Sequence, residues 1–354
     1  LASRTDPMIS ELEGREKEDA WLGLAWRGKD QRVDFEHRTG REQREAAARE
    51  RSGRRRYHNT VNNLDRSLSS LGWETAWTGA GALPAGTGQL RVYRSRIDVE
   101  NLRSAGVTVN PRQQIEDRVL EGQARLALGA NALTGGFEAR DESLADPGLP
   151  AGRSVSRSRA LFLQDELAVT SRFSLTLGMR HDRYRLFGDE WSPRLYGVWQ
   201  ADASWTVKGG YSHGFKAPNL KQIVPGGRAE GPNTFLGNPA LQPERSRGME
   251  LGVDYAAGAT QAQLMLFDQR VEDLIEVRLV VAGALPGVGT YTYENLARAR
   301  LRGAEASLAQ ALGSGFALQL SYAYLDARTA AGQRLDKRPR HSATVRLDWQ
   351  GGPW

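Results

Sequence analysis

Strict alternation of apolar and polar residues is the feature that most constrains the fold of this chain. Between Phe316 and Leu325, every second residue is large and apolar or aromatic, and the residues between them are small or polar. Other segments with the same period of two are 172–184, 203–211, 249–255 and 342–349. Because successive side chains of a strand point to opposite faces, this pattern predicts β-structure with one apolar face. A soluble sandwich would alternate in the same way.

The connections between the expected strands separate a membrane barrel from a sandwich. We expect fifteen strands, over 15–27, 30–39, 60–78, 87–98, 114–128, 131–143, 157–170, 172–185, 192–201, 203–213, 246–256, 260–271, 291–311, 316–328 and 340–350. The short connections are 28–29, 129–130, 171, 202, 258 and 313–315, and the long ones are 40–59, 99–113, 144–156, 214–245 and 272–290. Residues 1–14 and 40–58 are expected to be loop. Short periplasmic turns opposite long extracellular loops are typical of outer-membrane barrels. The sequence therefore predicts an all-β fold, a transmembrane antiparallel β-barrel.

The positions of the aromatic residues agree with a membrane barrel. Those near the short-turn ends of the expected strands are Trp26, Trp77, Trp199, Trp205, Tyr255 and Trp349. Those near the long-loop ends are Tyr184, Trp191, Tyr211, Tyr322 and Tyr324. Tyr and Trp prefer the two membrane–water interfaces, so the two sets predict two aromatic girdles.

The composition excludes several classes of function. The chain has 48 Lys and Arg against 42 Asp and Glu, a net charge of +6, which does not indicate a nucleic-acid partner. It has no cysteine, which excludes disulfides, zinc fingers and thiol nucleophiles. No run of eighteen apolar residues occurs, so no transmembrane helix is expected, and the strands of a barrel give only a weak hydropathy signal.

Sequence signatures of enzymes are missing. No glycine-rich phosphate loop, HExxH motif or nucleophile elbow is present. The five histidines are dispersed, at His37, His58, His181, His213 and His341. We therefore expect no catalytic residue, no metal site and no cofactor.

Both ends of the sequence look truncated. The chain begins at Leu1 without an initiator Met or a signal peptide, and it ends at Trp354 directly after an expected strand. We expect residues 1–354 to form one β-barrel domain that is incomplete at both ends. Unpaired edge strands should make such a fragment aggregate or close badly when isolated.

A series of motifs resembles the barrel of TonB-dependent outer-membrane receptors, the family that imports ferric siderophores, haem and cobalamin. The resemblance covers roughly residues 157–350. Its motifs, in order, are 163–166 (LQDE), 174–180 (SLTLGMR), 191–194 (WSPR), 208–218 (KGGYSHGFKAP), 237–239 (GNP), Leu241, 243–244 (PE), 249–252 (MELG), 294–295 (EN), 302–306 (RGAEA) and 338–341 (RPRH). Singly, such residues also suit structural roles: Pro218 and Pro239 end strands, Gly303 allows a close backbone approach, and Glu305 would face the lumen.

This resemblance implies a barrel of about 22 strands closed around an N-terminal plug, of which about 15 strands are present here. It also implies that plug and TonB box lie outside the sequence, and that the receptor, a monomer surrounded by outer-membrane lipid, couples to the TonB–ExbB–ExbD complex through that plug. Transport driven by this complex makes and breaks no covalent bond. Without its plug, the fragment should not support such transport.

The ligand implied by the resemblance is a ferric siderophore. Haem receptors of this family place a histidine between two boxes that correspond here to 215–218 and 238–241, and 219–237 contains no histidine. His213 lies before the first box. Anionic siderophores favour cationic loops. The candidate binding residues are Lys216, Lys221, Arg228, Arg334 and Lys337. A haem or cobalamin receptor is the alternative; a general porin, usually with about sixteen strands, lacks these ordered motifs.

Overall fold

The computed structural model describes residues 14–49, 57–81, 83–104, 112–149, 151–230, 233–283 and 288–351. Fifteen long strands form the wall. They are β1 (Gly14–Arg27), β2 (Gln31–Arg49), β3 (Tyr57–Trp77), β4 (Gly86–Arg103), β5 (Gln113–Leu128), β6 (Asn131–Ala145), β7 (Arg153–Ala168), β8 (Phe173–Tyr184), β9 (Gly188–Gln200), β10 (Trp205–Lys216), β13 (Glu244–Ala257), β14 (Thr260–Ala282), β15 (Gly289–Gly313), β16 (Phe316–Thr329) and β17 (His341–Trp349). Between β10 and β13 lie α1 (Leu220–Ile223), β11 (Gly227–Glu230) and β12 (Asn233–Leu236). The described part of the chain holds no helix long and apolar enough to cross a membrane.

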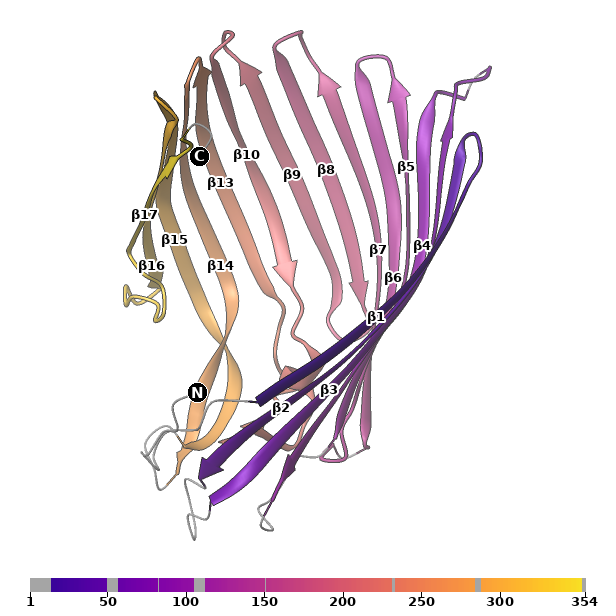
Figure 1. The fold of residues 1–354 in the computed structure, drawn as a ribbon, viewed down its shortest axis with the longest axis vertical. Coiled ribbons are helices and arrows are strands. Elements are labelled where there is room, and N and C mark those ends of the chain that lie inside the picture. The colour runs from indigo at the N-terminus through magenta and orange to yellow at the C-terminus, as the bar shows by residue number, and fades with distance from the viewer. Residues whose placement is uncertain are drawn as a thin grey trace.

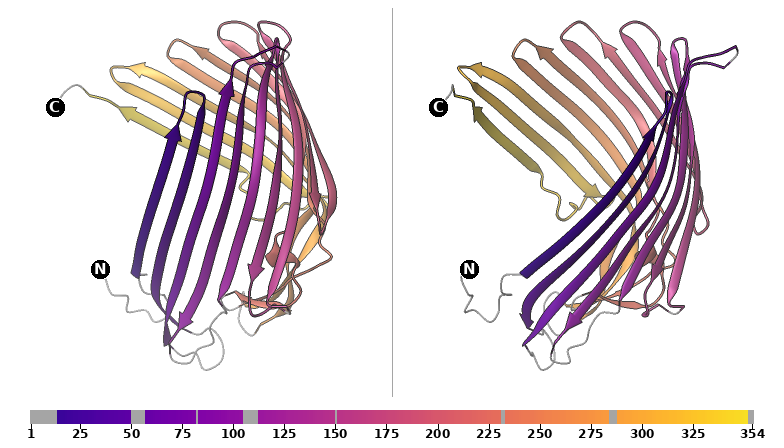
Figure 2. Two further views of the ribbon diagram at one scale, coloured as in Figure 1. Left: turned by 90° about the vertical axis from the view of Figure 1, so that its right-hand side faces the viewer. Right: turned by 45° about the vertical axis from the view of Figure 1, so that its right-hand side comes forward.

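The wall is one curved, tilted sheet in which each long strand pairs antiparallel with the next (Figure 1). Strand β10 pairs with β9 on one side and β13 on the other, so the segment that contains α1, β11 and β12 leaves the wall at that point. Two further views show β1 and β17 as the two outer strands of the sheet (Figure 2). The predicted all-β barrel wall with fifteen strands is confirmed.

The strands alternate between a short-turn end and a long-loop end. The turns after β1, β5, β7, β9, β13 and β15 gather at the short-turn end, at the top of Figure 1. The segment between β10 and β13 lies at the long-loop end. The predicted sorting of connections is therefore correct in its order along the chain.

The predicted loop over 40–58 is wrong for much of its length. Strand β2 continues to Arg49 and β3 begins at Tyr57, with register pairs from Gly40 opposite Arg66 to Arg49 opposite Tyr57. Most residues here are polar on both faces, so the alternation that marks the wall toward the short-turn end is missing. Ladder hydrogen bonds and ion pairs, such as Arg44 Nε to Glu42 Oε1 at 2.6 Å, hold this part together. Residues 50–56 lie outside the described residues, as do 1–13 of the loop expected over 1–14.

Three other long connections are shorter than predicted. Strand β14 runs to Ala282 and β15 begins at Gly289, so most of the expected loop 272–290 is a hairpin. Residues 279–281 (LVV) are apolar without a period of two, which hides the end of this strand from a pattern search. Strand β4 extends to Arg103 and β7 begins at Arg153, which shortens the loops expected over 99–113 and 144–156.

Register pairs define an apolar face and a polar face of the wall. One row of the apolar face is Trp26, Val33, Trp73, Leu90, Gly122 and Phe137. Large side chains stay exposed on this face, for example Leu251, Leu266 and Val345, the last 71% exposed. In outer-membrane barrels the apolar face contacts lipid.

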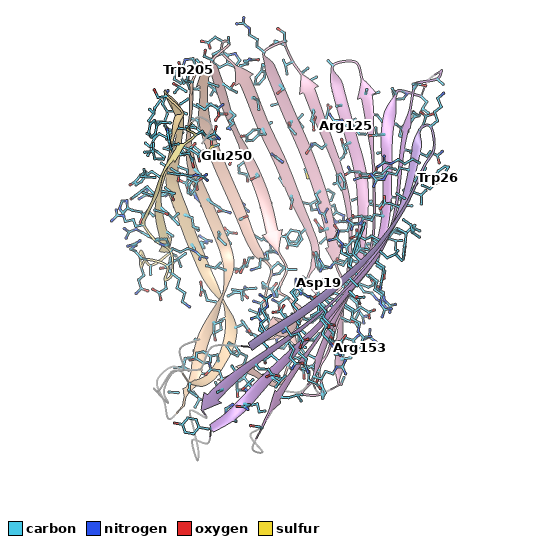
Figure 3. All side chains as sticks on the ribbon, in the orientation of Figure 1. Asp19, Trp26, Arg125, Arg153, Trp205 and Glu250 are labelled. Carbon is cyan, nitrogen blue, oxygen red and sulfur yellow. The ribbon has the colours of Figure 1, made fainter. Side chains whose placement is uncertain are left out.

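The aromatic girdle at the short-turn end is confirmed in position. Trp26 and Trp205 lie in the upper part of Figure 3, beside the short turns, and both belong to rows of the apolar face. Trp205 packs on Tyr255 with ring centroids 4.7 Å apart. At the long-loop end, Tyr184 packs against Phe187 and Phe215 instead, so that girdle is less regular than expected.

Gly303 is required where β15 crosses its neighbours. A Cβ at this position would lie 2.1 Å from the Tyr324 carbonyl oxygen and 2.7 Å from the Phe267 ring. The expected close backbone approach at this motif residue is therefore confirmed. Glu305, two residues on, lies between Met265 and Ala323 in a row of the polar face, as expected.

Candidate functional site

The segment between β10 and β13 is folded against the wall, and its anchor begins with a short helix. Asn219 caps α1: its side chain accepts a hydrogen bond from the Gln222 amide at 3.0 Å, and the Gln222 side chain accepts one from the Asn219 amide at 2.9 Å. This capping box satisfies two amides that an isolated turn would leave unpaired. It fixes the direction in which the chain leaves β10.

A small apolar core lies under α1 at the long-loop end. Its buried members are Leu144, Leu149, Leu220, Ile223, Val224 and Leu241, with Ile115, Phe187, Ile275 and Tyr293 packed against them. The core joins the β6–β7 connection, α1 and the chain before β13. Leu144 and Leu241 are each 1% exposed. Burial of this kind is the main term that holds the segment in place.

The GNP motif fixes the segment through its backbone. A Cβ at Gly237 would lie 1.8 Å from the Val224 carbonyl oxygen, so no larger residue fits without movement of the main chain. Asn238 donates from Nδ2 to the Tyr293 carbonyl at 2.8 Å and accepts at Oδ1 from the Ala240 amide at 2.9 Å. These contacts tie the motif to β15, 55 residues further along the chain.

Asn295 and Glu244 complete this attachment to the β14–β15 hairpin. The Asn295 side chain accepts from the Gln242 amide at 2.9 Å and donates to the carbonyls of Gln242 at 3.0 Å and Asp273 at 2.6 Å. Glu244 Oε1 accepts from the Ile275 amide at 2.9 Å. The motif residues Asn238, Asn295 and Glu244 therefore have structural roles, as the sequence suggested for such residues singly.

Arg245 links three strands at the same level. Its Nε donates to Glu190 Oε1 at 3.0 Å, and Nη1 lies 3.5 Å from Asp273 Oδ2. Glu190 is buried, at 6% exposure. The hydrogen bond with Glu190 raises the pKa of Arg245, and the charge-assisted pair is the strong kind of hydrogen bond. Through these two contacts, Arg245 joins β9, β13 and β14 where the segment meets the wall.

The tip of the segment is a two-stranded ribbon attached to the hairpin by aromatic contacts. In β11 and β12, Arg228 is the register partner of Phe235. The Phe235 ring stacks on Tyr291 with centroids 5.4 Å apart and lies 5.9 Å from the Tyr293 ring. Strand β12 also pairs parallel with β15. The tip therefore carries Phe235 beside Tyr291 and Tyr293, on the strand that pairs with the one containing Arg228.

The structure places three of the five predicted binding residues on this segment or at its start. Lys216 ends β10, with Nζ 3.4 Å from Glu244 Oε2. Lys221 lies in α1 and Arg228 in β11. Arg334 and Lys337 are exposed in the separate β16–β17 connection, where Lys337 has φ of 57°. The five residues thus form two groups on different loops.

Sequence reasoning missed the aromatic members of the site. Tyr291 and Tyr293 alternate with threonine (TYTY in 290–293), which is a strand signal. The pattern predicts a strand from residue 291 but gives no sign that these two rings meet a ring from another segment. Phe235 carries no periodic signal, because β12 has only four residues. Only the tertiary fold brings Phe235 to the two tyrosines.

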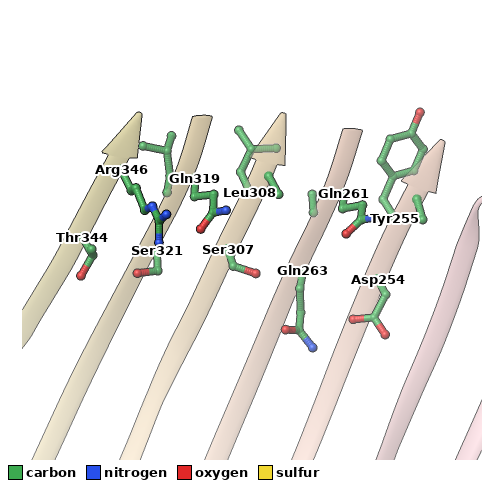
Figure 4. A pocket seen from close by; sticks show the side chains of 14 residues that line it. Asp254, Tyr255, Gln261, Gln263, Ser307, Leu308, Gln319, Ser321, Thr344 and Arg346 are labelled. Atoms are coloured by element: carbon green, nitrogen blue, oxygen red, sulfur yellow. The ribbon is translucent and has the colours of Figure 1, made fainter. Parts of the chain in front are cut away.

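The polar face of the wall carries a second feature, a shallow hollow near the short-turn end. Figure 4 shows Asp254, Gln263, Ser307, Ser321 and Thr344 projecting from five neighbouring strands, and these residues form one register row. The hollow measures about 520 Å³. Such a hydrophilic wall suits a water-filled lumen or a hydrophilic domain inside it.

The described residues offer no constellation for bond chemistry. Among them, no group of three or more His, Asp or Glu side chains has the arrangement to hold a metal ion. His213 lies in the register row of Arg247, on the apolar face.

Comparison with known proteins gives the relationships of the chain. The family model described as TonB dependent receptor-like, beta-barrel matches residues 14–354. The chain is 34% identical over 252 residues to the iron-regulated outer membrane virulence protein of Vibrio cholerae. The alignment covers 67% of this chain and 39% of that protein. It is 30% identical over 233 residues to the ferric enterobactin receptor of Pseudomonas aeruginosa, with 59% of this chain and 31% of that protein covered. It spans less than half of either relative.

Solved structures agree on the architecture. The siderophore receptor PirA from Pseudomonas aeruginosa superposes with a TM-score of 0.79 at 25% identity, over 96% of this chain and 60% of that one. The copper transporter OprC superposes with a TM-score of 0.73 at 15% identity, over 96% of this chain and 57% of that one. The second likeness shows the fold alone, so the wall by itself does not select a ligand.

Proposed function

Because this chain belongs to the TonB-dependent receptor-like β-barrel family, we propose that it is the barrel portion of a receptor for active uptake of a ferric siderophore. Its relatives are named outer-membrane receptors, which places the protein in the outer membrane of a Gram-negative bacterium and in a family of transporters rather than enzymes.

The single observation that carries the proposed ligand is the tip of the β10–β13 segment. There Phe235 stacks on Tyr291 and lies beside Tyr293, and Arg228 is its register partner on the other strand of the ribbon, next to an anchor made of buried apolar residues and motif hydrogen bonds. A ferric catecholate is an anion built from aromatic rings, so a guanidinium offers it both charge and cation–π contact, and aromatic side chains offer stacking. Lys216, Lys221, Arg334 and Lys337 are the further cations proposed to contact ligand.

Transport is proposed to need the rest of the receptor. A plug inside the barrel would rest against the polar face, including the hollow lined by Asp254 and Ser307. The TonB–ExbB–ExbD complex would pull on this plug and open a path for the ligand. The receptor is proposed to act as a monomer without a resident cofactor, since the iron complex is its cargo.

The position of His213 supports a siderophore over haem. Haem would need an axial ligand directed to the ligand path, whereas His213 belongs to the apolar face, and 219–237 contains no other histidine. Uptake of haem or cobalamin remains an outcome of the test rather than a second proposal.

The test is growth of a strain that lacks the full-length receptor gene. Ferric catecholates, ferric hydroxamates and haem are supplied in turn as the sole iron source, with the restored gene as control. The proposal expects growth to fail on one siderophore class only. Loss of growth confined to haem overturns it.

A binding measurement on the full-length receptor tests the proposed site directly. Phe235→Ala should weaken binding of the growth-supporting siderophore by about tenfold, since a desolvated cation–π or stacking contact contributes on the order of 1–2 kcal/mol. The matched control is Phe316→Ala, at the short-turn end of β16, which should leave affinity unchanged. Equal effects of the two variants would rule out the tip as the contact site.

A further inference from the structure

Four arginines lie side by side on the apolar face of the wall. Register pairs join Arg247 of β13 to Arg270 of β14, Arg270 to Arg300 of β15, and Arg300 to Arg328 of β16. All four are exposed. We call Arg247, Arg270, Arg300 and Arg328 the arginine row. The four strands stand next to one another in the left part of Figure 1.

The arginine row borders the lipid-facing band. Toward the short-turn end, the same face continues with Met249 and Leu251 on β13 and with Leu266 on β14. On β15 and β16 it continues, after one further charged residue, with Ala304 and Tyr324. On each strand, the arginine therefore lies one or two same-face positions from the last apolar or aromatic side chain, in the direction of the long-loop end. This is the level at which lipid headgroups begin.

The row carries more positive charge than its neighbours neutralise. Asp268 pairs with Arg300, and Asp326 lies 2.8 Å from Arg328 Nε and 3.4 Å from Arg302 Nη2. Five arginines, counting Arg302, thus face Asp268, Asp326 and, beside Arg270, Glu272, and retain two positive charges. Within the described part of the chain, neither Arg247 nor Arg270 makes a hydrogen bond or an ion pair through its side chain. Like charges opposite each other on a sheet repel, so an anion from outside would relieve this row.

A hollow beside Arg247 and Arg270 offers space for such an anion. It measures about 310 Å³ and is lined by Tyr211, Arg245, Arg247, Met249, Asp268, Arg270 and Glu272. Arginine guanidinium groups match phosphate oxygens in bidentate geometry. The methionine and tyrosine add apolar surface on the side of the membrane band.

At the corresponding level of the opposite part of the wall, each arginine has a carboxylate partner. There the row contains Arg94, Arg118, Asp141 and Arg157. Glu116 lies 2.7 Å from Arg94 Nη2 and 2.6 Å from Arg118 Nε, and Asp141 lies 3.1 Å from Arg159 Nη1. In the part of the chain that the structure describes, arginines without a carboxylate partner are therefore found at Arg247 and Arg270 and not among the arginines of this second row.

We propose that the arginine row binds the phosphate-bearing headgroup of an outer-leaflet lipid. The acyl chains of this lipid lie along the apolar face at Leu251 and Leu266 and continue toward the short-turn end. Its phosphate reaches Arg247 and Arg270. The proposal rests on the membrane location of the barrel and not on which ligand the receptor transports.

The test uses the full-length receptor in detergent micelles and native mass spectrometry to count retained lipid. The probes are lipid A with both phosphates, dephosphorylated lipid A, and inorganic phosphate as competitor. The variant is Arg247→Gln/Arg270→Gln. The control, Arg157→Gln/Arg159→Gln, changes the same charge on the same face, at two arginines that both pair with Asp141.

The proposal expects wild type to retain lipid A in preference to its dephosphorylated form. It expects the variant to bind lipid A roughly 25-fold more weakly, at about fivefold for each of the two arginines near the headgroups. The control should bind as wild type does. Equal retention of the two lipids, equal losses in variant and control, or displacement by millimolar inorganic phosphate would each overturn it. Siderophore binding should be unchanged in the variant, so failure here is distinguishable from failure of the proposed function.

Discussion

Truncation of Leu241 to alanine is the sharpest test of how the β10–β13 segment is held. The side chain is 1% exposed and belongs to the apolar core that joins α1, the β6–β7 connection and the chain before β13. Complete burial of a leucine makes its removal costly, because the site loses both transfer free energy and packing contacts.

The size of the effect follows from where the core lies. Leu→Ala at buried sites costs about 2–5 kcal/mol, and a small core at the rim of a wall can partly collapse, so we expect the lower part, about 2–3 kcal/mol. At about 1.4 kcal/mol for each tenfold, the segment should open roughly 30–150 times more often. The wall itself should keep its stability, since its strands are held by their own ladders.

Hydrogen exchange of the folded full-length receptor measures this directly. The amides of Val224 and Asn238, which donate to the Leu220 and Gln222 carbonyls, should exchange faster by that factor, whereas amides in the middle of β8 and β9 should not change. Leu266→Ala is the matched control, because Leu266 is 48% exposed on the apolar face. Unchanged exchange in the segment, or equal acceleration throughout the wall, would refute this account of the anchor.

Three further predictions follow from the same structure. Gly237→Ala should displace the segment more than Leu241→Ala does, because the added Cβ would meet the Val224 carbonyl at 1.8 Å; Gly178→Ala in β8, where the added Cβ would meet only ordinary contacts from 3.7 Å, is the control, and protease sensitivity of the segment is the measurement. Asn295→Ala removes three hydrogen bonds at about 1 kcal/mol each; it should open the 240–243 stretch in hydrogen exchange, while Asn131→Ala near the short-turn end leaves it closed. Hydrogen bonds from Arg94 lower the pKa of Glu116, and hydrogen bonds from Arg96 lower that of Asp98. These carboxylates therefore stabilise the long-loop ends of β4 and β5 above the usual acid pKa near 4, and the contribution is lost as the pH falls through the lowered values; protection factors there, corrected for the intrinsic pH dependence of exchange, should be lower at pH 3 than at pH 6, with a smaller difference in Glu116→Gln, and an identical pH dependence in the variant would contradict it.

Much of the wall could be predicted from the sequence because its part toward the short-turn end obeys a simple physical rule. Where one face meets lipid and the other meets water, residues such as Leu318, Leu320 and Tyr322 must alternate with small or polar ones, and the pattern is visible without a structure. The part of the wall at the long-loop end has water on both faces, so nothing forces residues 40–49 to alternate. Their strand is held by register with β3, which is a non-local property.

The candidate site was predictable only in part for a related reason. Lys216 and Arg228 could be selected by charge and by their place in a long connection. The partners of Arg228 could not, because Phe235 meets Tyr291 and Tyr293 only after the segment folds back on the β14–β15 hairpin. That return depends on Gly237, Asn238 and Asn295, whose contacts span more than fifty residues.

The anchor and the tip of the segment use different residues, and this has a consequence for how such receptors change over time. Leu241, Gly237 and Asn238 hold the chain without belonging to the ribbon of β11 and β12, which carries Arg228 and Phe235. Substitutions in 227–236 can therefore alter what is recognised while the attachment persists. A lineage could acquire a new iron source by exchange of a few tip residues, without having to rebuild the scaffold that presents them.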